Sequence, residues 1–185
     1  MRLIMLVPVA VLALSACDKA DKGPKTMEQA KNEASQLERP DPGQYQQTTK
    51  VTKFDMPGAP PQMVDQIRKM MEGQGGNLTY CLSKADTDKG FAEMFKKGAK
   101  GECTYDRFNA SANTIDAIMT CKAGTGGAAK MTMNGTVSAT GSHVKVNVEQ
   151  KNDKSPMGNA TIAMELDTKR IGDCPAGADK PKVPG

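Results

Sequence analysis

The sequence predicts an α+β fold, namely an antiparallel β-meander of about seven strands with two short helices packed on one face and disulfide staples. Two observations lead to this prediction. Apolar and polar residues alternate with a period of two over most of the chain, which is typical of half-buried strands. Two other segments carry apolar residues at helical spacing and are bounded by helix start or stop signals.

The strands are clearest in the second half of the chain. Met131 and Met133 begin an alternating segment that runs to residue 139, and a second one follows the dipeptide Gly141-Ser142. A two-residue loop that begins with Gly suits a tight hairpin turn, and this turn would place Val137 opposite Val146. Further strands are expected at 44–54, around Cys103, Tyr105 and Arg107, around Ile115, Ala117 and Met119, and around Ile162, Met164 and Leu166.

Two helices are expected to interrupt the early strands. The first follows Pro60 and Pro61, ends near Gly73, and carries one apolar stripe made of Met63, Val64, Ile67, Met70 and Met71. We expect this stripe to pack on the sheet, with Met63, Ile67, Met70 and Met71 lining a candidate apolar pocket. The second helix would be capped by Ser83, with Asp86 three residues on, and its apolar side would comprise Phe91, Met94 and Phe95.

Four cysteines lie in the same region as these strands and helices, and an even number in an exported chain favours disulfides. Cys103 and Cys121 are symmetric about Ala112, so a hairpin that turns at 109–113 would place them opposite each other. Cys81 and Cys174 are then left to form a second disulfide. A redox-active or metal-binding set of thiols is the alternative.

The first residues form a targeting signal. Arg2 precedes an apolar run from Leu3 to Leu14, which is shorter than the ~20 residues that span a bilayer. The sequence Leu14-Ser15-Ala16-Cys17 resembles the lipobox of bacterial lipoproteins. This resemblance implies that Cys17 receives a diacylglyceryl group, with fatty acids such as palmitate, and becomes the first residue after cleavage. An ordinary secretory signal with an incidental Cys is the alternative.

The chain divides into four predicted parts. These are a lipoprotein signal peptide at 1–16, a lipid anchor and flexible tether at 17–42, one α+β domain at 43–174, and a disordered tail at 175–185. The tether is charged and holds three prolines, which is typical of a linker. A short helix inside it remains open, because Thr26 and Gln29 are spaced as a capping box ahead of Ala30 and Ala34.

Several short motifs spread over 42–175 resemble an uncharacterised bacterial family catalogued as domain of unknown function thirty-six-seventeen. Their order and spacing carry the resemblance, since no single motif is specific. They are Pro42-Gly43-Gln44-Tyr45, Met56-Pro57-Gly58-Ala59-Pro60, Cys81-Leu82, Cys103-Thr104-Tyr105 with Phe108, Ile115-Asp116-Ala117 with Met119 and Cys121, Met131-Thr132-Met133 with Gly135, and Arg170-Ile171-Gly172-Asp173-Cys174-Pro175. The family contains small exported proteins and lipoproteins, which implies an envelope location but transfers no catalytic residue.

Composition excludes several classes of function. The 185 residues carry a net charge of +4, which is too small and too scattered for a nucleic-acid-binding protein. A single His argues against a His-rich metal site and against a Ser-His-Asp triad. We therefore expect no enzyme and no cofactor, but a periplasm-facing envelope lipoprotein that binds an apolar ligand or an envelope protein. Asp18 leaves open whether its membrane is the inner or the outer one.

Methionine provides the alternative hypothesis. The chain has 13 Met, and Met131 and Met133 are two residues apart on a predicted strand, so both side chains would reach one ion. Thioethers are soft ligands that suit Cu(I), and this spacing resembles that of periplasmic Cu(I) sites. The same alternation also suits a core-facing strand or a pliable apolar pocket. Core packing is the interpretation we adopt, with Cu(I) binding as the alternative.

Overall fold

The computed structural model describes residues 23–75, 77–90, 103–123, 127–152 and 158–177. The predictions for Cys17, for Phe91, Met94 and Phe95, and for the end of the tail lie outside these residues. The helices are α1 (Met27–Ala34), α2 (Pro61–Gly75) and α3 (Lys84–Lys89). The strands are β1 (Gly43–Asp55), β2 (Asn77–Leu82), β3 (Cys103–Ser111), β4 (Thr114–Ala123), β5 (Gly127–Ser138), β6 (Gly141–Lys151) and β7 (Ala160–Gly172).

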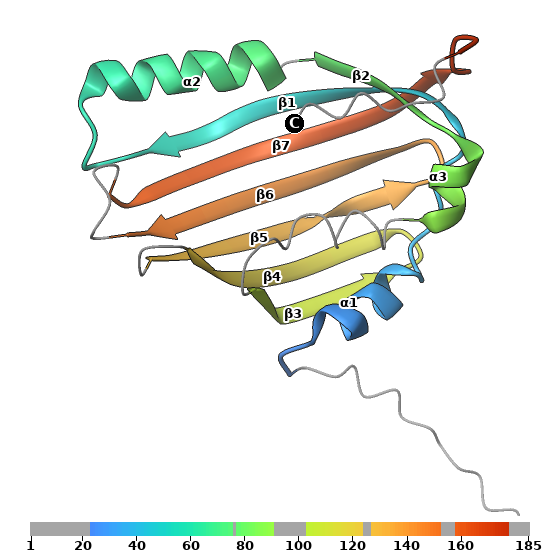
Figure 1. Ribbon diagram of the computed structural model, residues 1–185, viewed down its shortest axis with the longest axis horizontal. Coiled ribbons are helices and arrows are strands. Elements are labelled where there is room, and N and C mark those ends of the chain that lie inside the picture. Colours follow the sequence, from blue (N-terminus) through green and yellow to red (C-terminus); the bar gives the residue numbers. More distant parts are fainter. Residues whose placement is uncertain (1–22, 76, 91–102, 124–126, 153–157, 178–185) are drawn as a thin grey trace, which may run out of the picture.

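The seven described strands form one antiparallel sheet in the order β2-β1-β7-β6-β5-β4-β3 (Figure 1). From β3 to β7 each strand pairs with the next one in the chain, which makes a meander. β7 then pairs with β1 from Gln44 to Asp55, so the first and last strands of the domain lie side by side. The predicted α+β meander is therefore confirmed.

The sheet is twisted and curved rather than flat (Figure 1). The register shifts by one residue at Asp106 in β3, at Thr52 in β1 and at Ile171 in β7. Such bulges bend a strand and increase its twist. Gly135 adds to the curvature, because a Cβ there would lie 2.2 Å from the His143 carbonyl oxygen on β6.

The hairpin of β3 and β4 confirms the first predicted disulfide. Cys103 and Cys121 are register partners with Cα atoms 4.0 Å apart, and their sulfur atoms are bonded. The predicted symmetry about Ala112 holds for this pair. The bulge at Asp106 then shifts the rest of the hairpin by one residue, so that Ser111 pairs with Thr114 at the turn.

The register predicted for β5 and β6 is wrong. Val137 lies opposite Ser142, and Val146 lies opposite Met133, because the turn consists of Ala139 and Thr140 rather than Gly141 and Ser142. The displacement is an even number of residues. Since side chains alternate between faces, an even displacement leaves every side chain on its predicted face. Val137 and Val146 consequently still share a face, as expected.

Residues 25–41 are packed against the sheet, so the predicted flexible tether is wrong for this segment. Thr26 and Gln29 form the capping box that starts α1, with hydrogen bonds of 2.8 and 3.2 Å. Ala30, Ala34 and Leu37 are then buried against β3 and β4, with 1–3% exposure. Composition suggested a linker because only this narrow stripe is apolar, and its partners come from a distant part of the chain.

Backbone hydrogen bonds extend this attachment across two hairpin turns. The Glu38 amide donates to the Ala112 carbonyl at the turn between β3 and β4, at 2.6 Å. The Asp41 amide donates to the Ala139 carbonyl at the turn between β5 and β6, at 2.7 Å. The segment that follows α1 is thus fixed to the ends of both hairpins before β1 begins.

Lys25 attaches the start of this segment to the edge strand β3. Its backbone pairs with that of Tyr105, and its side chain is only 4% exposed. The ammonium group donates to the Phe108 carbonyl at 2.7 Å and forms an ion pair with Glu33 of α1. A buried ammonium without partners would be costly, so this geometry fixes α1 at one position on the sheet.

Replacing Lys25 with Ala should lower the free energy of unfolding by about 2–4 kcal/mol, since the Phe108 carbonyl and Glu33 would both lose their charged partner. Chemical denaturation of the purified protein measures this change. Lys84→Ala is the matched control, because Lys84 is 80% exposed and its ion pair with Asp88 contributes less than about 1 kcal/mol. Equal stability of the two variants would contradict the attachment through Lys25.

Helix α2 confirms the predicted position of the first helix but only part of its predicted packing. Pro61 is its first residue, and the helix lies along β1 (Figure 1). Ile67 and Met71 are partly buried, whereas Met63 and Met70 are 42% and 53% exposed. The helix therefore buries only one side of the predicted stripe.

Helix α3 has the predicted capping box. The Ser83 hydroxyl accepts from the Asp86 amide, and the Asp86 carboxylate accepts from the Ser83 amide, both at 3.2 Å. The helix ends at Gly90, whose φ of 59° is a conformation that favours Gly.

Candidate functional site

Three cross-strand rows of side chains form one apolar face in the middle of the sheet. Each row is a set of register partners on β5, β6 and β7. The central apolar face, as we name it, consists of Met131, Met133, Val144, Val146, Val148, Ile162, Met164 and Leu166. The opposite face of the same strands carries polar and charged pairs, such as His143 with Asp167 at 2.6 Å and Lys145 with Glu165 at 3.6 Å.

Coverage of the apolar side changes across the sheet. At the β3–β4 end, under α1, Tyr105, Phe108 and Ala117 are 0–1% exposed. On the central apolar face Val146 is buried, and the other seven side chains are partly exposed. The described helices pack chiefly on β1, β2 and β3, which explains this difference. Within the described part of the chain, the apolar side chains in the middle of the sheet therefore keep partial exposure.

The candidate pocket predicted on the first helix does not form as predicted. Met63 and Met70 point to solvent, and Ile67 and Met71 face the sheet. A cleft of 160 Å³ lies elsewhere, at the ends of β1, β6 and β7, and its lining includes Asp55, Glu149 and Lys151. None of the four residues predicted for the pocket lines this charged cleft.

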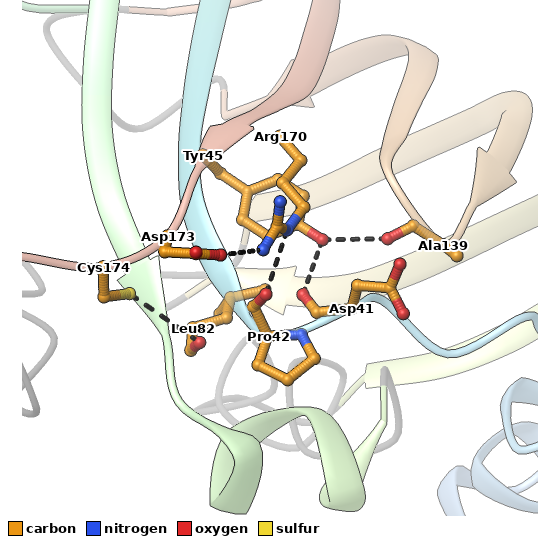
Figure 2. Close-up of polar contacts among 8 residues, drawn as sticks. All are labelled: Asp41, Pro42, Tyr45, Leu82, Ala139, Arg170, Asp173 and Cys174. Atoms are coloured by element: carbon orange, nitrogen blue, oxygen red, sulfur yellow. Dashed lines mark hydrogen bonds and ion pairs between the residues drawn. The ribbon is translucent and has the colours of Figure 1, made fainter.

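A polar cluster closes one end of the sheet, where the first and last strands of the domain meet (Figure 2). The Arg170 side chain donates to the Pro42 carbonyl at 3.0 Å and to the Asp173 carboxylate at 2.5 Å. The Tyr45 hydroxyl lies 2.7 Å from the Asp41 carbonyl and 2.9 Å from the Ala139 carbonyl. These contacts join the start of the domain, the β5–β6 turn and the end of β7, so the role of the cluster is to fasten the sheet.

Burial of the aromatic side chains shifts their ionisation. Tyr45 is 2% exposed, and its ring stacks on that of Tyr80 with centroids 5.9 Å apart. Loss of hydration raises the pKa of Tyr45 above its ordinary value of 10.0, and the Asp41 carboxylate raises it further while Arg170 opposes the shift. Burial also raises the pKa of Tyr80 and of Tyr105. All three phenols are therefore protonated at physiological pH.

These raised pKa values predict a loss of stability in alkali. Below about pH 10 the phenols are protonated in both states, and their stabilising effect is complete. As pH rises further, the unfolded chain releases these protons before the folded one, so the free energy of unfolding falls. Tyr45→Phe should cost about 1–2 kcal/mol at neutral pH and weaken the alkaline dependence.

Denaturation curves between neutral pH and pH 11 measure both effects. Ser111→Ala is a suitable control, because the hydroxyl that it removes, with its hydrogen bond to Thr114, is exposed to water, so stability should change by about 0.5 kcal/mol or less. An unchanged alkaline dependence in Tyr45→Phe would contradict the assigned burial of this phenol.

The second predicted disulfide is not formed in the structure. Tyr80 shares a face with Tyr45, so alternation places the Cys81 side chain on the opposite face of β2, where it is a free thiol. The Cys174 sulfur instead points to the Leu82 carbonyl oxygen at 4.0 Å (Figure 2). The prediction is therefore correct that Cys174 lies near the end of β2, and wrong that its sulfur is bonded to that of Cys81.

Methionine side chains gather where the central apolar face meets the buried core. Met131 lies opposite Met119 of β4, and Met133 is two residues farther along the same face. Met119 is 8% exposed, while Met131 and Met133 are partly buried against the core. The predicted inward direction of Met131 and Met133 is confirmed. Among the described residues, no group of three or more His, Cys, Asp or Glu side chains could hold a metal ion.

Residues 40–174 match the model of a protein family described as protein of unknown function, DUF3617. The chain belongs to the DUF3617 family. Comparison with curated proteins and with solved structures gives no significant match. The matched region of this DUF3617 domain begins and ends at the polar cluster, so the cluster joins the two ends of the family domain. Within the described residues, no helix combines the length and hydrophobicity needed to span a bilayer.

Proposed function

We propose that the protein is a lipoprotein of the bacterial cell envelope, anchored through acylated Cys17 and facing the periplasm, that binds an apolar ligand without catalysing a reaction. The signal that ends in Leu14-Ser15-Ala16-Cys17 supports the anchor. A disulfide between Cys103 and Cys121 supports an oxidising compartment, since such bonds are rare in the cytosol. Removing the signal leaves 185 − 16 = 169 residues in the anchored protein.

The central apolar face is the observation that carries the binding role. Seven of its eight side chains keep partial exposure on a sheet whose β3–β4 end is fully covered. These partly exposed side chains continue into the buried core at β4, and a partly accessible apolar surface of this kind is typical of a binding site. Three of the eight side chains are methionines, which are flexible enough to adapt to ligands of different shape.

An environment-sensitive apolar dye, N-phenyl-1-naphthylamine, should fluoresce strongly when it binds this face. Leu166→Asn places a polar amide in the face and should weaken dye binding roughly tenfold, since burying it against hydrocarbon costs about 1–2 kcal/mol. Fluorescence titration of the full-length protein in detergent below its critical micelle concentration measures the dissociation constant.

Lys169→Asn is the matched control for this titration. Lys169 lies on the same strand, is exposed, and projects from the opposite face, so its replacement should leave the dye affinity unchanged. Absence of dye binding by the parent protein, or equal affinities of the two variants, would refute the binding role.

Cys17→Ala tests the anchor. The variant lacks the thiol that accepts the diacylglyceryl group, so it should no longer incorporate labelled fatty acid and should no longer remain in the membrane fraction. Metabolic labelling with palmitate followed by fractionation measures both properties. A parent protein that incorporates no label, together with a variant that fractionates as the parent does, would exclude lipidation.

Cu(I) binding is the second candidate function, and the cross-strand position of Met119 beside Met131 favours it. Three thioethers, from Met119, Met131 and Met133, share one end of the face and would suit a soft cation. Replacing Met131 and Met133 with Leu nearly preserves apolar volume, so stability should change by about 1.5 kcal/mol or less per site. Competition with a Cu(I)-chelating dye measures the affinity, and a tight site lost in this double variant would favour metal binding over the apolar ligand.

A further inference from the structure

We infer that the occupant of the central apolar face is an acyl chain of a phospholipid, taken from the bilayer in which the protein is anchored. This inference rests on the proposed function and adds to it the chemical class and the source of the ligand. It follows from the length of the chain before Lys25, from the dimensions of the face, and from the polar row that borders the face.

Packing of the segment after Lys25 leaves a short connection to the anchor. From Cys17 to Lys25 the chain advances 25 − 17 = 8 residues, which reach at most about 29 Å when fully extended. Lys25 itself pairs with Tyr105 on the edge strand β3. The β3 edge therefore stays within about one domain diameter of the bilayer surface, whatever path the connecting residues follow.

The central apolar face begins close to that edge. Neighbouring strands are about 4.8 Å apart, so β5 lies roughly 10 Å and β7 roughly 19 Å from β3. A lipid that leaves the bilayer beside the anchor thus travels to the face over a distance similar to the extended length of residues 17–25. A ligand already present at high local concentration in the membrane has the shortest route to this face.

The dimensions of the face fit a hydrocarbon chain better than a protein partner. Its three rows span two strand spacings, about 10 Å, and four residue steps along each strand, about 13 Å. The face has eight side chains, whereas each partner of a stable protein complex contributes about 20–30 residues. One flexible acyl chain lying along the strands would cover the face.

An uncharged polar row borders the face on the side of the polar cluster. Thr168 of β7 lies between Gln47 of β1 and Ser142 of β6, and all three share the face with Leu166. Hydroxyl and amide groups at the end of a hydrocarbon surface provide hydrogen-bond partners for the ester groups that join acyl chains to a phospholipid headgroup.

Photo-crosslinking of the anchored protein tests this assignment. The full lipidated chain is reconstituted in vesicles of phosphatidylethanolamine and phosphatidylglycerol that contain a phospholipid with a diazirine in its acyl chain. After irradiation, peptide mapping should find the crosslinks on β5, β6 and β7. Leu166→Asn should reduce them roughly tenfold relative to Lys169→Asn, which leaves the face intact.

A longer connection provides a second test that leaves the folded domain unchanged. Inserting about twenty Gly and Ser residues after Asp18 lowers the effective concentration of bilayer lipid at the face, so crosslinking to β5–β7 should fall several-fold. Crosslinking that is insensitive to the insertion would overturn the role of the short connection.

Two further outcomes would overturn the inference while leaving the proposed function testable on its own. Crosslinks restricted to peptides next to Cys17, in a protein that still binds the apolar dye through Leu166, would mean that the ligand is apolar but is not bilayer phospholipid. Crosslinks to β5–β7 that appear only when the diazirine is carried by the protein's own acyl groups would make the anchor itself the occupant. Loss of both crosslinking and dye binding would refute the proposed function as well.

Discussion

The structure depends on one constraint, which is that a single antiparallel sheet collects the apolar residues of seven strands on one face and must cover them. Side chains alternate between the two faces of a strand, so every strand of the meander contributes its apolar side chains to the same face of the sheet. The described helices are short and pack at the two ends of the sheet. Full burial is achieved under α1, and partial exposure remains in the middle.

Helix α1 covers the apolar side chains of β3 and β4, and a buried lysine holds it there. Its apolar stripe is narrow, so burial of Ala30, Ala34 and Leu37 alone would attach it weakly. The buried Lys25 sets the position of the helix on the sheet, because its ammonium group forms an ion pair with Glu33 and donates a hydrogen bond to the Phe108 carbonyl. By fixing residues 25–41, this contact would also limit how far the domain moves from the lipid anchor that we propose at Cys17.

The polar cluster has the corresponding role at the ends of the family domain. Tyr45 and Arg170 are register partners on β1 and β7, and their side chains hold the residues that enter and leave the sheet. Because the first and last strands pair directly, and Tyr45 bonds to the turn that follows β5, the cluster holds together the strands that carry the central apolar face. A rigid sheet with an accessible apolar middle is the property on which the proposed ligand binding depends.

The sequence by itself determined which residues share a face. Alternation at Met131, Met133, Val137 and Val146 fixed their common side even though the predicted turn was displaced, because an even displacement preserves faces. Helix signals at Pro61 and Ser83 and the Cys103–Cys121 pair were likewise local properties of the chain. How much of the apolar face is covered, and that residues 25–41 pack on β3, followed from the tertiary structure alone. Those outcomes depend on contacts between segments that are far apart in the chain. Each such contact gains free energy from burial and loses chain entropy, and a local sequence pattern does not show which of the two is larger.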